Sequence, residues 1–117
     1  MKKYSPTHEW VEECGEEFLI GLSDYAQKEL GDIVFVNLLD VGDPLICGES
    51  FADVESVKAV SEIYAPLSGI ISAVNQEVLE NAAVINEDAE NTWLVKVKDV
   101  TQRMDLLEAE EYLASLK

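Results

Sequence analysis

One lysine, Lys58, lies far along the sequence from any other basic residue, which makes its amine a candidate for covalent modification. Between Lys28 and Lys96 the sequence contains 13 acidic residues and this single basic residue. A lysine amine can be modified covalently, so one amine held apart from all others would be an identifiable attachment point. The alternative is a solvated strand lysine that pairs with a neighbouring acid and contributes little to stability. Composition alone favours this second interpretation.

The other reactive side chains offer little for catalysis or metal binding. The chain has one histidine, His8, and two cysteines, Cys14 and Cys47, which do not form a C-x-x-C pair. Zinc sites need clusters of Cys and His, and the sequence has no phosphate-binding glycine loop, nucleophile elbow or EF-hand pattern. A His8–Cys14 dyad is conceivable, but two small buried or half-buried thiols are the simpler interpretation. We therefore expect neither a metal site nor a catalytic residue.

The charge balance excludes several classes of partner. Among 117 residues there are 24 acids and 8 Lys or Arg, which gives a formal net charge of −16. Eight scattered cations cannot cover a nucleic-acid phosphate track, and the same charge opposes docking on an anionic membrane. Because 48% of the residues are hydrophobic, the chain can still build a core, and basic partners would be attracted to it.

The apolar segments are too short for a membrane span. The longest runs, such as residues 33–36, contain four residues, and the basic start Met1-Lys2-Lys3 is followed by polar residues instead of the hydrophobic part of a signal peptide. Two cysteines without an evident partner fit a reducing compartment. We expect a soluble cytoplasmic protein.

Many short strands separated by turns are predicted. A hairpin is expected around the turn at 14–16, and the apolar run 33–38 reads as a strand buried on both faces. The alternation at 93–98 predicts a strand with one inner and one outer face. Further strands are expected within 51–64 and at 70–74, with turns at 42–44, at Gly48 and at 65–69.

Helices are predicted at two places. Ser23 is a suitable N-cap and Gly31 a suitable C-terminal cap for a helix over 24–30. At the end of the chain an apolar stripe with helical spacing follows a run of acids, and Lys117 closes it, the order that suits a helix dipole. The stripe consists of Ala109, Tyr112, Leu113 and Leu116. Thr101 is a candidate cap for a short earlier turn, and 75–91 reads as acidic and partly loop. The sum is a mainly β fold, a sandwich or flattened barrel with short helices.

The residues around Lys58 point to a known family. The sequence E-S-V-K-A at 55–59, followed by A-P-L-S-G at 65–69, resembles a lipoyl-attachment hairpin, whereas biotinyl domains carry Met on both sides of the lysine. The chain as a whole resembles the H-protein family of the glycine cleavage system. The segments that carry this resemblance are 7–10, 20–27, 30–36, 54–60 and 93–97, together with Asn75 and Asn86.

The resemblance implies a carrier and not an enzyme. It implies the lipoyl/biotinyl-carrier fold over residues 1–117 as one monomeric domain, with lipoate in amide linkage on Lys58 at a hairpin tip. The implied partners are a glycine decarboxylase (P protein), an aminomethyltransferase (T protein) and a dihydrolipoyl dehydrogenase (L protein). A lipoate ligase or a lipoyl/octanoyl transferase would attach the cofactor, whose dithiolane does the sulfur chemistry.

The resemblance also implies a cleft that receives the loaded arm. Glu9 would take the ammonium group of the aminomethyl unit, with Thr7 and Glu62 in the same neighbourhood, and a charge-assisted contact of this kind contributes about 1.5–3 kcal/mol. The alternative for Glu9 is a surface acid at the start of a strand. Trp10 is expected to pack in the interior. Glu55 and Glu62 would be acidic marks read by the lipoylating enzyme.

One stretch departs from the family pattern, and two other functions stay open. Residues 86–93 contain neither Gly nor Pro where the family has a turn rich in both, and Ala82 and Ala83 stand where Pro is common. These positions are expected in loops, so the departure concerns partner binding more than the fold. The nearest alternative function is a relay of lipoyl groups to other lipoate-dependent enzymes. The other is an unmodified acidic interaction module in which Lys58 is only solvated.

Overall fold

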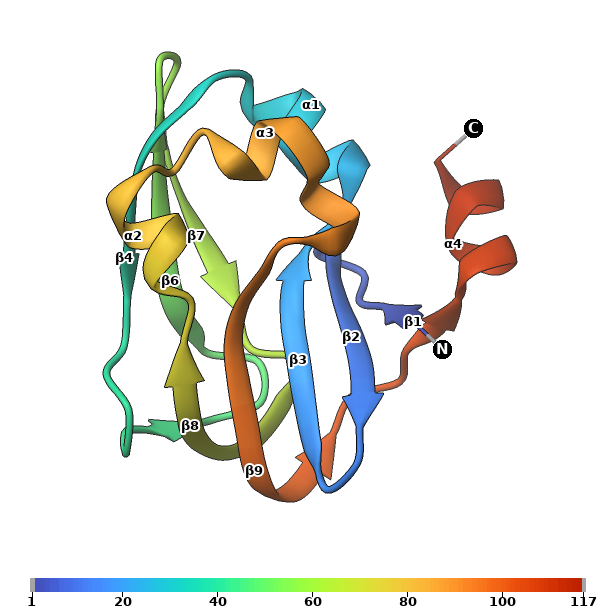
Figure 1. Cartoon of the computed structure of the whole chain (residues 1–117). Helices are drawn as coiled ribbons and strands as arrows, with labels where there is room; N and C mark the ends of the chain where they lie inside the picture. The colour runs from blue at the N-terminus through green and yellow to red at the C-terminus, as the bar shows by residue number, and fades with distance from the viewer. Residues whose placement is uncertain (1, 117) are drawn as a thin grey trace.

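Two antiparallel β-sheets share one hydrophobic core in the computed structural model, which describes residues 2–116 (Figure 1). The larger sheet has the strand order β10-β1-β2-β3-β9-β8-β5 and the smaller one β4-β6-β7; across residues 2–116 neither closes on itself. The sandwich, one of the two predicted architectures, is therefore confirmed. The strands are β1 Lys2–Tyr4, β2 Glu9–Cys14, β3 Glu17–Leu22, β4 Ile33–Leu38, β5 Pro44–Leu45, β6 Ser50–Ser56, β7 Val60–Tyr64, β8 Leu67–Val74, β9 Trp93–Arg103 and β10 Leu107–Glu108.

Short helices gather at one end of the sandwich, except the C-terminal one, which packs beside β1 and β10 (Figure 1). Helix α1 has the predicted bounds and caps: the Ala26 amide donates to Ser23 Oγ at 3.1 Å, and Gly31 takes a φ of +79°. No helix within residues 2–116 has the length and apolar character needed to cross a membrane. The helices are α1 Asp24–Leu30, α2 Gln76–Glu80, α3 Val84–Asp88, the 3-10 turn η1 Ala89–Asn91, and α4 Ala109–Ser115.

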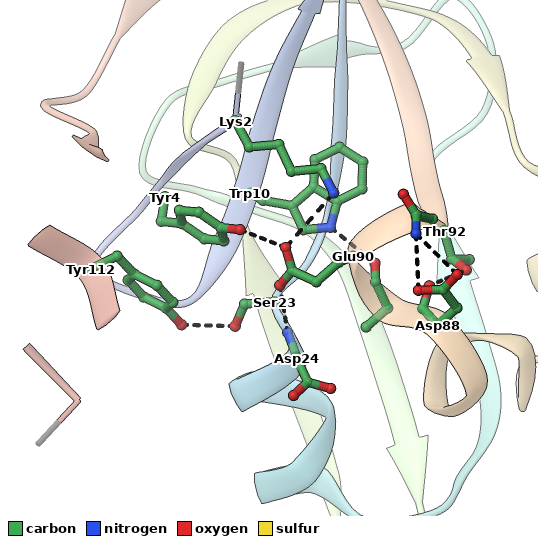
Figure 2. A network of polar contacts seen from close by, with 11 residues as sticks. Lys2, Tyr4, Trp10, Ser23, Asp24, Asp88, Glu90, Thr92 and Tyr112 are labelled. Atoms are coloured by element: carbon green, nitrogen blue, oxygen red, sulfur yellow. Dashed lines mark hydrogen bonds and ion pairs between the residues drawn. The ribbon is translucent and has the colours of Figure 1, made fainter. Parts of the chain in front are cut away.

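A polar network ties η1 and α4 to the body of the molecule (Figure 2). Glu90 accepts hydrogen bonds from the backbone amide of Asp24, at 2.8 Å, and from the Tyr4 hydroxyl. The Tyr112 ring stacks on Tyr4 with 4.4 Å between centroids, and its hydroxyl lies 2.7 Å from Ser23 Oγ. Glu90 thus holds the N-terminus of α1, while Tyr112 is the contact that anchors α4.

Strand β4 is not buried on both faces, so that prediction was wrong. Val34 is 59% exposed and Phe35 46% exposed, whereas Ile33 and Val36 are buried. The small sheet packs only its inner face against the core, so its outer face meets solvent. In β6, a strand expected within 51–64, Ala52 and Val54 are buried, whereas Asp53 and Glu55 are half-buried.

The turn predicted at 65–69 is shorter than expected, because β8 already begins at Leu67. Gly69 lies inside β8, where an added Cβ would come within 2.6 Å of the Lys98 carbonyl oxygen of β9. This glycine therefore marks a close approach of two strands. The helical turn capped by Thr101 was also wrong, since β9 continues to Arg103.

The alternation along β9 is interrupted by a bulge. Ile20 lies opposite Val95, but Gly21 lies opposite Trp93, so Leu94 is an extra residue in β9. Leu94 and Val95 are consequently both buried, which simple alternation does not allow.

Two predictions near the C-terminal half need correction. The stretch 75–91 is partly loop, as predicted, at 81–83, but the departing positions of 86–93 were also expected in loops and lie mostly in α3 and η1 instead. In α4 only Tyr112 is buried, while Leu113 of the predicted apolar stripe is 59% exposed. Lys117, predicted to close this helix, lies outside the described residues.

Candidate functional site

Lys58 lies at the tip of the hairpin that joins β6 to β7 (Figure 1). The Ser56 amide donates to the Ala59 carbonyl at 2.8 Å, and Ser56 Oγ accepts from the amides of Lys58 and Ala59, both at 3.2 Å. A serine side chain therefore shapes a tip that lacks the Gly or Asn usual in tight hairpins. The tip position, which the sequence indicated only through the family resemblance, is present in the structure.

The Lys58 side chain is exposed, and within residues 2–116 no carboxylate lies within ion-pair distance of its amine. The alternative of a strand lysine paired with an acid thus does not describe this residue. Its side chain instead runs across Gly31, since a Cβ atom added to that glycine would lie 3.1 Å from Lys58 Cε.

Acidic side chains follow the outer face of the small sheet below the tip. Glu55 lies opposite Val60, and Asp53 lies opposite Glu62 on the neighbouring strand. Residues two apart in a strand share a face, so Glu55, Asp53 and Glu62 project from the same side. The surface next to Lys58 is therefore negative.

Glu9, at the start of β2, is a buried carboxylate with only 1% of its surface exposed. Its Oε1 accepts hydrogen bonds from Ser5 Oγ at 2.6 Å and from Thr7 Oγ1 at 2.5 Å. Burial raises the pKa of Glu9 to about 7, although the hydroxyls of Ser5 and Thr7 and the backbone amide of Tyr64 favour the charged form and limit the shift. The reading of Glu9 as a surface acid is therefore wrong.

A pocket of about 300 Å³ lies beside this carboxylate: Glu9 does not line it, but Thr7, which binds Glu9, does. We call it the Glu9 pocket. Tyr64, at the end of β7, forms one side, and its hydroxyl donates to Glu62 Oε2 at 3.1 Å. Thr7, which bonds Glu9, forms another side. The pocket is lined by Pro6, Thr7, Gly48, Tyr64 and Met104. Strand β7 thus leads from the lysine tip down to a pocket with a buried acid beside it.

The predicted site residues do not all lie together. Thr7 and Glu9 are in direct contact, and Glu62 reaches the pocket wall through Tyr64. Glu55 lies on the sheet face nearer the tip. Sequence reasoning missed Ser5 and Tyr64. Tyr64 shares the strand face of Glu62 by the two-residue period, and this was a usable signal.

The remaining candidates are structural. Trp10 is 1% exposed and its Nε1 donates to the Ala89 carbonyl at 3.0 Å, so packing is confirmed. His8 precedes β2 and Cys14 ends it, which excludes a dyad; His8 Nδ1 lies 2.7 Å from the Tyr112 hydroxyl instead. Cys47 is half-buried, but Cys14 is exposed, contrary to expectation. In the described part of the chain no three His, Cys, Asp or Glu side chains are arranged to hold a metal.

Comparisons with known proteins all lead to one family. The family model described as glycine cleavage H-protein matches residues 2–117. A glycine cleavage system H protein of Lachnoclostridium phytofermentans is 49% identical over 110 residues, covering 93% of this chain and 87% of the relative. The one from Vibrio atlanticus is 48% identical over 119 residues, with 98% and 94% covered. The crystal structure of a glycine cleavage system H protein from Mycobacterium marinum matches with a TM-score of 0.91 at 35% identity, covering 98% of this chain and 95% of that one.

Proposed function

Because the chain belongs to the glycine cleavage H-protein family, we propose that it carries lipoate in amide linkage on Lys58. In this role it is a non-enzymatic, monomeric carrier of one domain, residues 1–117, in the cytoplasm. It would shuttle the aminomethyl group of glycine from the decarboxylase to the aminomethyltransferase and then meet dihydrolipoyl dehydrogenase. The observation that carries the proposal is the location of Lys58, the single basic residue of 29–95, exposed at a hairpin tip.

The surroundings of Lys58 fit a covalently attached group. The amine is accessible, and no described carboxylate has to release it before it reacts. The hydrogen bonds of the tip use backbone atoms and Ser56 Oγ, so acylation of the amine leaves them intact. Lipoate, when bound, supplies a redox-active disulfide, and the protein supplies presentation and electrostatics.

The Glu9 pocket would hold the amine of the loaded arm. A buried carboxylate beside a small pocket gains a strong charge-assisted hydrogen bond when a cationic amine enters, because little water competes for either group. The amine would favour the charged form of Glu9 and lower its pKa from the value near 7. Ser5 and Thr7 orient the carboxylate, and Glu62 lies at the pocket wall through Tyr64.

Attachment of the cofactor would use the acidic face of the small sheet. Glu55 and Glu62 project on the side of the sheet that leads to Lys58, and a basic surface on a lipoate ligase or a lipoyl/octanoyl transferase would complement them. These acids therefore serve as the recognition marks for the enzyme that modifies Lys58.

Intact-mass measurement tests the attachment directly. The chain is co-expressed with a lipoate ligase in medium containing lipoate, and one added lipoyl group is expected. Lys58→Arg keeps the charge but should remove the added mass completely, whereas Lys96→Arg should keep it. An unmodified wild-type chain, or added mass that persists in Lys58→Arg, would leave the acidic interaction module as the better description.

Exchange kinetics test the place in glycine cleavage. The lipoylated protein is mixed with a competent glycine decarboxylase, and glycine-dependent exchange of bicarbonate carbon is measured. We expect exchange that depends on the protein concentration and disappears with Lys58→Arg. Full lipoylation without exchange would favour the relay of lipoyl groups to other lipoate-dependent enzymes.

A further inference from the structure

Residues 31 and 32, which follow α1, lie against the hairpin tip that carries Lys58, and we call this segment the floor of the tip. The Val57 amide donates to the Asp32 carbonyl at 3.0 Å, which fixes the tip against this segment. Beside it, Lys58 passes over Gly31, and an added Cβ there would lie 3.1 Å from Cε and 3.6 Å from Nζ. The lysine therefore has a contact surface on one side and solvent on the other, and a Cβ atom at position 31 would require Lys58 Cε to shift by a few tenths of an ångström.

Asn86 of α3 holds this floor in place. Its Oδ1 accepts from the Ile33 amide at 2.8 Å, and its Nδ2 donates to the Gly31 carbonyl at 2.9 Å and to Gln27 Oε1 at 3.0 Å. One half-buried side chain thus connects the last turn of α1, the glycine under Lys58 and the first residue of β4.

We propose that Gly31 and Asn86 are positioning residues for Lys58: together they form a seat that sets the direction of the lysine side chain and so presents its amine to the modifying enzyme. The inference rests on the proposed function, because it assumes that Lys58 is the modified residue. A free lysine explores many rotamers, and an enzyme that must capture one of them loses affinity accordingly. The seat reduces this loss before the enzyme binds.

The test compares two glycines that both have a positive φ and that differ in their surroundings. Gly31→Ala adds a Cβ against Lys58, whereas Gly15→Ala has a comparable φ of +66°, in the β2–β3 turn at the other end of the molecule, with nothing within 4 Å of its Cβ (Figure 1). Both variants place an alanine at positive φ, and Gly31 also has a ψ of −156°, so Gly31→Ala carries the larger backbone strain. We expect kcat/KM for modification by purified lipoate ligase to fall about tenfold in Gly31→Ala, mainly through KM, and to stay near the wild-type value in Gly15→Ala.

A second pair keeps the test informative if Gly31→Ala folds poorly. Asn86→Ala removes the three hydrogen bonds of the seat, while Asn91→Ala, in the adjacent η1, removes only contacts with the Asp88 side chain. Asn86→Ala should lower kcat/KM, and NMR relaxation of the Lys58 Cε methylene should show faster motion than in Asn91→Ala. Acylation of Lys58 by a small water-soluble reagent should proceed equally in both, since the amine itself is unchanged.

The outcomes separate the two proposals. Equal kcat/KM values in Gly31→Ala and Gly15→Ala, with the wild type modified on Lys58, would overturn the seat and leave the carrier function standing. A wild-type chain that the ligase does not modify on Lys58 would overturn both.

Discussion

A hairpin tip and the start of a strand each present one ionisable side chain in this molecule, and they do so in opposite ways. The β6–β7 tip places Lys58 in solvent, and its hydrogen bonds come from the backbone and Ser56. The turn before β2 places Glu9 in the interior, where two hydroxyl groups bind one of its oxygens. A group that must be reached by an enzyme has to remain accessible. A group that must bind a small cation gains by being dry, because burial strengthens the interaction.

The contrast between these two regions predicts where substitutions will lower the free energy of unfolding most. The start of β2 is buried in the body of the sandwich and adjoins the α1 and η1 contacts, so changes there should be costly. Apart from the pairing of β6 with β7, the described contacts of the lysine tip are with residues 31 and 32, the floor that follows α1. Three substitutions, taken from the largest expected effect to the smallest, measure this contrast.

Trp10→Ala should have the largest effect. Trp10 is fully buried beside Tyr4 and Tyr112, and the Gly21 backbone lies so close that an added Cβ would come within 2.5 Å of the indole ring. Removing it leaves a large cavity and an unpaired Ala89 carbonyl, which should lower the free energy of unfolding by about 3–5 kcal/mol. Chemical denaturation measures the change. Trp93→Ala, at a half-buried position, is the matched control and should lose clearly less; equal losses would contradict the contrast.

The elements that sequence predicted well are those defined by local signals. Helix α1 has the predicted ends, because an N-cap serine and a glycine of positive φ act within a few residues of the helix. The burial of β4 was mispredicted, since an apolar run does not say which of its faces a second sheet covers. Gly69 was read as a turn residue because nothing local shows that β9 passes against it.

The features of the candidate site also divide into those that the sequence indicated and those that only the structure shows. Lys58 was singled out by the charges along the sequence, and Glu9 by the resemblance. The burial of Glu9 was not foreseen, because it depends on a turn that folds Ser5 and Thr7 back over its carboxylate. The hairpin tip gave no turn signal because Ser56 stabilises it through a side chain instead of through Gly or Asn. Asn86 matched the family pattern, yet its contacts with the floor of the lysine tip are visible only in three dimensions.

Glu9→Gln should have an intermediate effect that depends on pH. Burial raises the pKa of Glu9 from an ordinary value of 4.5 to about 7, so between these values the folded state binds more protons than the unfolded state. The wild-type protein therefore loses stability as pH rises through this range, whereas the uncharged variant does not. From pH 4.5 to pH 8 the variant should gain up to about 3 kcal/mol relative to the wild type.

Denaturation at a series of pH values, with a carbon-13 titration of the Glu9 carboxyl, checks this prediction. Glu62→Gln is the matched control, because that carboxylate is exposed and its removal should produce no comparable pH dependence. A stability difference between Glu9→Gln and wild type that stays constant from pH 4.5 to pH 8 would mean that Glu9 ionises like a surface acid.

Lys58→Gln should have the smallest effect, within about 0.5 kcal/mol of the wild-type free energy of unfolding. The side chain is exposed, and its contact with Gly31 positions the lysine without holding the fold. Lys28→Gln is a useful reference, because Lys28 pairs with Asp24 at 2.9 Å within α1 and its loss should lower stability by about 0.3–0.5 kcal/mol. If Lys58→Gln were more destabilising than Lys28→Gln by 1 kcal/mol or more, the tip lysine would have a structural role. A negligible change instead means that the fold does not depend on the Lys58 amine, as the proposed attachment of a group to this lysine requires.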